Sequence, residues 1–256
     1  MSVWYDFGMQ IKLLQWNILY KERIEDIAKT IKKLNPDIVC LQELGINCKF
    51  NLIIPDTAKY IKEELGYSSF FKEAQRWKDD DEMDAIGNGI FTRFPITRTF
   101  SKQVQNQTGK FVDYSSEGRI YIEATIEVGD IGLTVGTTHL SYVHKFGITE
   151  EKKTEVDNLV KIVLEKEKNY IFTGDFNSIP DSYTISELSK YLKNCGPSFD
   201  QNTWANKPFD YNGFKEDKIA WRLDYVFTSK DVDCISAEII QTEFSDHLPI
   251  LVSLNI

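Results

Sequence analysis

Cysteine is scarce in this sequence, and no cysteines lie at the spacings that bind zinc. The four are Cys40, Cys48, Cys195 and Cys234, and no two of them form a CxxC pair. This pattern excludes the common structural zinc motifs. Cys40 lies within an apolar run typical of a strand, so we expect four reduced, structural thiols, as in a cytosolic protein.

Long apolar runs are also missing. No stretch approaches the roughly 18 apolar residues of a membrane-spanning helix. The N-terminus, MSVWYDFGMQIK, lacks the basic segment followed by an apolar segment that marks an export signal. We therefore predict no membrane span and a cytoplasmic location, with residues 1–9 as an N-terminal extension.

An excess of positive charge is absent as well. The chain has 39 acidic and 30 basic residues and a net charge of −9, which argues against a broad basic face that grips nucleic acid. It does not exclude a nuclease, because part of the acidity could belong to a site that collects cations. The alternative is that the acidic residues simply keep the surface soluble.

The sequence contains neither repeats, low-complexity tracts nor a linker, so residues 10–256 are predicted to form a single domain. Apolar, strand-like runs occur at 11–18, 37–43, 119–128, 131–140 and 169–176, among others. Helical spacing occurs at 22–34, 56–65, 149–165 and 184–192.

The predicted fold class is α+β, with four layers. About ten to twelve strands interleaved with a few helices are more than a doubly wound sheet needs. Two mixed, mainly antiparallel sheets packed face to face, with helices outside, fit this pattern better. We therefore predict an α/β/β/α sandwich.

Polar residues end several of the apolar runs, where packing gives them no purpose. They are Asn17, Glu43, His139, Asp175, Asn177 and Asp246. Each has a structural explanation when taken alone, as a turn residue, a helix cap or the point where a strand meets water. Together they supply the oxygen ligands that a magnesium ion prefers and the groups that phosphate ester hydrolysis requires.

Seven short motifs along the chain resemble those of one known family. They are, in order, QWNIL (15–19), LQEL (41–44), GIFTRFPI (89–96), TTHL (137–140), GDFNSIPDS (174–182), RLDYVF (222–227) and SDHLPI (245–250). In this order they resemble the endonuclease/exonuclease/phosphatase superfamily, also called DNase I-like. Each motif alone is weak, but chance does not readily produce seven in order.

The resemblance implies a metal site. Glu43 would be the principal ligand of Mg²⁺, with Mn²⁺ as an alternative. Asn17 would lie beside it and hold metal or phosphate. Asp246 would complete the metal environment, directly or through water.

The resemblance also implies catalytic roles for five residues. Asp175 would orient or deprotonate the attacking water, and Asn177 would donate its amide to the phosphoryl oxygens. His247 would contact the scissile phosphate or act as an acid or base, with Asp224 fixing its tautomer. His139 would assist the leaving group.

Specificity is expected in the loops at 76–88, 104–118, 141–148 and 200–220. Candidate substrate-binding residues are Arg119, Asn88, Tyr142, Trp204 and Trp221, and loop aromatics could stack on bases, contact lipid or only fill the loops. His144 is expected at the surface.

The favoured partner is nucleic acid or a nucleotide-like ester, with a phospholipid or sugar phosphate as the alternative. TTHL differs from the tyrosine-bearing loop of abasic-site endonucleases, which argues against abasic-site specificity. A different class is an inactive binding protein on the same fold. No obligate protein partner is inferred.

Overall fold

The computed structural model describes residues 9–51, 53–77, 83–108, 114–166 and 168–256. Over these residues the chain forms two six-stranded sheets and a separate two-stranded hairpin. Of the predicted N-terminal extension, 1–9, the described part is Met9, which exchanges backbone hydrogen bonds with Ile256. Residues 78–82 and 109–113 of the predicted specificity loops lie outside the described residues.

The first sheet has the strand order β13-β14-β1-β2-β4-β3. Its strands are β1 (Gln10–Asn17), β2 (Ile38–Ile46), β3 (Ser68–Arg76), β4 (Ala85–Thr92), β13 (Asp233–Ile239) and β14 (Ile250–Asn255). The second sheet has the order β5-β6-β7-β8-β12-β9. Its strands are β5 (Ile96–Gln105), β6 (Arg119–Val128), β7 (Ile131–His139), β8 (Tyr170–Asp175), β9 (Lys193–Asn194) and β12 (Asp224–Thr228).

Both sheets are mixed. Among the described strands, β1 pairs in parallel with β2 and β7 pairs in parallel with β8, whereas the other pairs are antiparallel. A parallel connection needs a crossover, and α1 and α3 supply it. The chain passes from the first sheet to the second at Phe94-Pro95, between β4 and β5.

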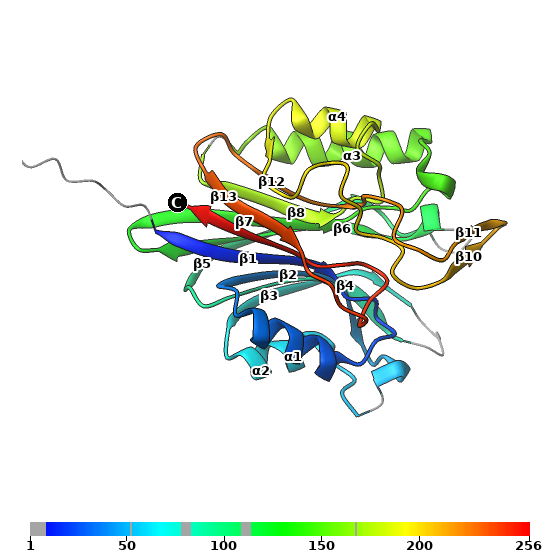
Figure 1. Cartoon of the computed structure of the whole chain (residues 1–256), viewed down its shortest axis with the longest axis horizontal. Helices are drawn as coiled ribbons and strands as arrows, with labels where there is room; N and C mark the ends of the chain where they lie inside the picture. Colours follow the sequence, from blue (N-terminus) through cyan, green and yellow to red (C-terminus); the bar gives the residue numbers. More distant parts are fainter. Residues whose placement is uncertain (1–8, 52, 78–82, 109–113, 167) are drawn as a thin grey trace, which may run out of the picture.

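Helices cover the outer face of each sheet (Figure 1). On the first sheet lie α1 (Ile24–Leu34) and α2 (Thr57–Leu65), and on the second lie α3 (Glu150–Val163) and α4 (Tyr183–Ser189). Short 3₁₀ turns occur at Lys49–Asn51, Tyr114–Ser116 and His144–Phe146. The predicted four-layer sandwich is confirmed.

Three apolar clusters hold these layers together. One lies between the sheets and includes Leu13, Ile122 and Val226. The other two lie between each sheet and its helices. In one of them Ile27 of α1 packs with the outward-facing Leu14 and Val39 of β1 and β2. In the other α3 and α4 pack on β8 and β12. Because both faces of β8 are covered, all six of its residues are buried. Asp175, its last residue, is therefore held in place by the packing of the whole strand.

The region 200–220, predicted as a loop, contains a hairpin. Its strands are β10 (Phe209–Tyr211) and β11 (Phe214–Glu216), and the turn between them is Asn212-Gly213. Both turn residues have positive φ, 47° and 79°, as a two-residue hairpin turn requires. This hairpin and the two-residue β9 bring the strands to fourteen among the described residues, more than the predicted ten to twelve.

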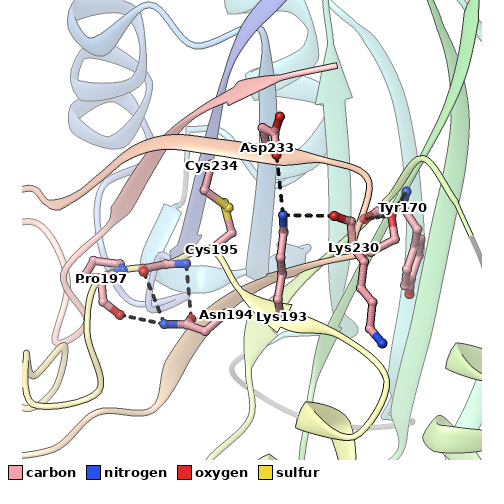
Figure 2. Close-up of a disulfide and its surroundings, with 10 residues drawn as sticks. Tyr170, Lys193, Asn194, Cys195, Pro197, Lys230, Asp233 and Cys234 are labelled. Atoms are coloured by element: carbon pink, nitrogen blue, oxygen red, sulfur yellow. Dashed lines mark hydrogen bonds and ion pairs between the residues drawn. A yellow bond between two sulfur atoms is a disulfide. The ribbon is translucent and has the colours of Figure 1, made fainter.

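The prediction of four reduced cysteines is wrong for two of them. Cys195, directly after β9, and Cys234, in β13, form a disulfide with Cα atoms 5.6 Å apart (Figure 2). Because β9 and β13 are edge strands of different sheets, the disulfide joins the two sheets. Cys40 and Cys48 are free and buried. Disulfides persist mainly in oxidising compartments, so the argument from four reduced thiols to a cytoplasmic location no longer holds.

Within the described residues, none of the helices combines the length and apolarity that crossing a membrane requires.

Candidate active site

The topology brings the predicted polar residues to one edge of the sandwich. Asn17 ends β1, and His139 and Asp175 end the parallel neighbours β7 and β8, where the two residues are register partners. Asp224 begins the antiparallel β12 and pairs with Asp175. Parallel strands end at one edge and an antiparallel strand starts there, so side chains from distant parts of the sequence meet.

Asp175 lies at the centre of the site and is 1% exposed. Its Oδ2 accepts a hydrogen bond from Asn17 Nδ2 at 3.0 Å and lies 3.4 Å from His139 Nε2 and 3.5 Å from His247 Nε2. Its Oδ1 accepts from the backbone N–H of Asn177 at 2.9 Å. Burial raises the pKa of Asp175 to about 6, against the opposing effect of His247.

His247 is held in a charged state. Its Nδ1 donates to Asp224 Oδ2 at 2.8 Å. Burial opposes the charged form, but the carboxylates of Asp224 and Asp175 outweigh burial and raise the pKa of His247 well above its usual value. Thr203 donates its hydroxyl to the same Asp224 oxygen at 2.7 Å and so fixes that carboxylate. Asp224 Oδ1 is buried and has no hydrogen-bond partner among the described residues.

The surroundings of His139 favour its neutral form instead. Burial, and then the positive charges of Arg119 and His247, lower its pKa well below the usual value. Asn177 Nδ2 lies 3.1 Å from His139 Nε2 and donates to Leu140 O at 3.0 Å. A neutral and a charged imidazole therefore face one carboxylate. Such a separation of protonation states is the pattern that acid–base chemistry uses.

Glu43 and Asp246 place two further carboxylates beside Asp175. The register of β2 against β4 shifts between Leu41 and Leu44, and Glu43 lies in this bulge with φ of 63°. Asn17 Nδ2 and the Tyr20 N–H donate to the Glu43 carboxylate at 2.9 and 3.2 Å. Burial and then the charge of Asp246 raise the pKa of Glu43 to about 7.

The remaining contacts of Asp246 and Asn17 orient these groups. Trp204 donates its Nε1 hydrogen to Asp246 Oδ2 at 3.0 Å. Asn17 Oδ1 accepts from the Leu19 N–H at 3.1 Å, so the Asn17 amide is fixed with its nitrogen toward Glu43 and Asp175.

Two groups of side chains could hold a cation. Asp175, Asp224 and His247 offer ligand atoms within 4.8 Å of one another. However, both ring nitrogens of His247 face carboxylates, and a protonated imidazole has no free electron pair for a metal. Glu43 and Asp246 offer oxygen atoms alone. Burial and then repulsion by Asp246 raise the pKa of Glu43, and a bound cation would relieve this repulsion.

A cavity of about 750 Å³ opens at these residues. The cavity is lined by Arg119, Asn88, Tyr142 and Trp204, and also by Glu43, Asp246, His139 and His247. Arg119 forms an ion pair with Glu117, and Asn88 donates to Ile120 O at 3.0 Å.

The structure does not bring Trp221 to the cavity lining. Its half-buried ring packs 5.0 Å from Phe146 and 5.9 Å from Phe214, inside an aromatic cluster. Trp204 belongs to the same cluster and is 4% exposed, so only part of its edge reaches the cavity. His144 is exposed, as predicted.

Three of the predicted specificity loops meet in a tyrosine wall, which comprises Tyr114, Tyr142, Phe209 and Tyr211. Tyr114 lies 5.5 Å from Tyr142 and 5.0 Å from Tyr211 between ring centroids, and Tyr142 lies 6.0 Å from Phe209. Tyr114, Tyr142 and Phe209 line the cavity. The wall therefore places several aromatic rings, inclined to one another by 60° to 87°, beside the carboxylates and histidines.

Thr203 and Lys207 are among the site residues that escaped prediction. Thr203 supports Asp224, and Lys207 lines the cavity and pairs with Glu22. Neither lies in an apolar run or a recognisable motif, so no local signal could have identified it.

A two-sheet sandwich with carboxylates, amides and histidines gathered at one edge defines a phosphoester hydrolase. Residues 14–247 match the sequence profile of the Endonuclease/Exonuclease/phosphatase family, and the chain belongs to this family. The predicted family and the predicted enzyme class are thereby confirmed.

The chain is similar in sequence or in fold to proteins of different named activity. A DNA-(apurinic or apyrimidinic site) endonuclease of Dictyostelium discoideum is 25% identical over 289 residues, covering 96% of this chain and 72% of that protein. A mannosyl-6-phosphatase of Bacteroides thetaiotaomicron is 19% identical, with a TM-score of 0.68 over 96% of this chain and 100% of the other. D. rerio TDP2 complexed with single strand DNA product is 18% identical, with a TM-score of 0.70 over 96% and 99%.

Proposed function

We propose that the protein hydrolyses phosphodiester bonds of nucleic acid or of nucleotide-like esters, by in-line attack of water and with Mg²⁺ bound. The observation that carries this proposal is the position of Asp175 between a neutral and a charged histidine, beside two further carboxylates. This arrangement supplies a base for water and positive charge for a phosphorane.

The proposed cation site consists of Glu43 and Asp246, with Asn17 beside them to orient Glu43. Mg²⁺ needs only one or two carboxylates because it keeps much of its water; Mn²⁺ is the alternative. When bound, the cation would supply charge to neutralise phosphoryl oxygens.

The protein side chains would perform the remaining steps. Asp175 is positioned to orient water and to take its proton. His247, protonated because Asp224 faces it, would donate to a phosphoryl oxygen. Asn177 would donate its amide to the phosphate, and neutral His139 would stabilise the leaving group. Each role needs the geometry that the strand ends provide.

The tyrosine wall supports a nucleotide-like substrate over a sugar phosphate. A base stacked on an aromatic side chain contributes about 1–3 kcal/mol, whatever the base. Acidic proteins bind nucleic acid weakly through charge alone, so stacking and cation contacts would carry the affinity here. A substrate without an aromatic group would leave the wall unused.

The test compares wild type with Asp175→Asn on bis-p-nitrophenyl phosphate, with Mg²⁺ and with EDTA. Asp130→Asn serves as the matched control, because Asp130 is exposed in the turn between β6 and β7. We expect magnesium-dependent hydrolysis by wild type and Asp130→Asn, and a loss of at least about 100-fold in Asp175→Asn. Undiminished activity in Asp175→Asn would contradict the proposal.

A substrate panel then decides the class of ester. It comprises single-stranded and double-stranded DNA, RNA, abasic DNA, 5′-phosphotyrosyl DNA, mannose 6-phosphate and sphingomyelin. We expect the nucleic acids to be cleaved with higher kcat/KM than the sugar phosphate or the lipid. The opposite order would favour the sugar-phosphate or phospholipid alternative.

A further inference from the structure

Helix α3 carries a fully buried ion pair next to the active site. Lys152 and Glu155, one helical turn apart, are each 1% exposed, and Lys152 Nζ lies 3.5 Å from Glu155 Oε2. Lysine and glutamate are almost never fully buried without a specific reason. The proposed mechanism uses neither of them.

The ammonium group of Lys152 joins the two segments that follow β7 and β8. Its Nζ donates to Ser141 O at 2.6 Å and to Phe176 O at 3.0 Å, and it forms an ion pair with Glu155. Ser141 comes two residues after His139. Phe176 lies between Asp175 and Asn177. One side chain therefore fixes the backbone beside both groups of catalytic candidates.

Glu155 holds the first of these segments from the other side. Its Oε1 accepts from the Ser141 N–H at 3.0 Å and from the Ser141 hydroxyl at 3.3 Å. The segments also contact each other, because the Leu140 N–H donates to Asp175 O at 2.9 Å. Ser141 is thus held at both its N–H and its carbonyl by side chains of one rigid helix.

We propose that Lys152 and Glu155 are positioning residues, which hold His139 and Asn177 at the correct distance from the scissile phosphate. Packing alone would not need the charges, because apolar residues of similar volume often replace a buried ion pair with no loss of stability. Apolar residues, however, cannot hold backbone carbonyl and N–H groups. The proposal rests on the proposed function of His139 and Asn177.

The double variant Lys152→Met/Glu155→Leu tests this directly, because it removes both charges and keeps most of the volume. We expect a lower melting temperature, because buried Ser141 and Phe176 backbone groups lose their hydrogen bonds. In the folded variant we expect a 10- to 100-fold lower kcat and a KM within about threefold, since small displacements of catalytic groups cost about this much. The matched control is Lys153→Met/Glu150→Leu, which removes an exposed pair of the same spacing on the same helix. The control should retain wild-type kcat.

A second measurement does not depend on activity. The chain has three histidines, so their imidazole NMR signals are readily assigned. In the double variant the imidazole chemical shifts of His139 should change, whereas those of the exposed His144 should stay at their wild-type values. If wild type hydrolyses no phosphate ester, the proposed function fails, but the His139 signals still decide the positioning role.

A folded double variant with wild-type kcat and unchanged His139 signals would overturn the proposal. If the double variant does not fold, Glu155→Gln replaces it, because the glutamine keeps the volume but removes the carboxylate that pairs with Lys152 Nζ. A reduced kcat with shifted His139 signals in Glu155→Gln supports positioning. Wild-type values for both overturn it.

Discussion

Removal of the Cys195–Cys234 disulfide is expected to destabilise the fold strongly without changing catalysis. The bond closes a chain segment with a sequence separation of 39 residues. Chain entropy predicts that such a cross-link stabilises the folded state by about 4 kcal/mol, a large part of the roughly 5–15 kcal/mol that holds a typical domain folded. Neither cysteine lines the cavity, so kcat should stay at its wild-type value.

The assay is urea unfolding of wild type and of Cys195→Ala/Cys234→Ala, each with and without reductant. If the free energy of unfolding falls by about 3 kcal/mol per molar urea, a loss of about 4 kcal/mol lowers the urea midpoint by roughly 1.3 M. Alanine is preferred to serine because Cys195 is buried among apolar residues. Reductant should shift the wild-type midpoint and leave that of the double variant unchanged. Thiol titration of the unfolded, untreated protein should find two thiols, those of Cys40 and Cys48.

Two results would refute this reasoning. Four titratable thiols in the untreated protein would show that the bond does not form. An unchanged midpoint on reduction would show that the bond adds no stability. Because disulfides persist mainly in oxidising compartments, the thiol count also tests the predicted cytoplasmic location.

Three further predictions concern the active site. Since the folded-state pKa of Glu43 is raised from 4.5 to about 7, the metal-free protein should lose stability as the pH rises through this range. Added Mg²⁺ should therefore raise the melting temperature more at pH 8 than at pH 5; equal shifts in wild type and Glu43→Gln would contradict the proposed metal site. Asp224→Asn should lower kcat by about 10²- to 10³-fold. It should also move the alkaline limb of the kcat–pH profile to lower pH, because His247 loses the carboxylate that raises its pKa. An alkaline limb at the wild-type pH would argue against a protonated His247. Tyr142→Ala should raise KM for a dinucleotide about 5- to 150-fold, because it removes the stacking of one base on the Tyr142 ring. It should leave KM for mannose 6-phosphate unchanged. Equal effects on both substrates would exclude a stacking role.

Much of the fold could be predicted because its signals are local. The spacing of Ile24, Ile27 and Ile31 predicts α1, and the apolar runs before Asp175 and Asn17 predict strands buried on both faces. Hairpin β10–β11 was missed although Asn212-Gly213 is a strong turn signal, because each of its strands has only three residues, too few for a period of two to be recognised.

The sequence alone identified polar side chains near the ends of the strands, because each motif lies within a few residues of the run that places it. Glu43 is an exception, since it lies in a bulge inside β2 and not at its end. It could not determine how these side chains act on one another. The opposite charge states of His139 and His247 depend on burial and on carboxylates from other strands, and Trp221 is excluded from the cavity by packing on Phe146. Other contacts likewise join separate segments of the chain. They are the Cys195–Cys234 disulfide, the hydrogen bond from Thr203 to Asp224, and the hydrogen bonds from Lys152 to Ser141 and Phe176. Only the packing of the two sheets brings such residues within bonding distance, since the energy of each contact depends on the surroundings that other parts of the chain supply.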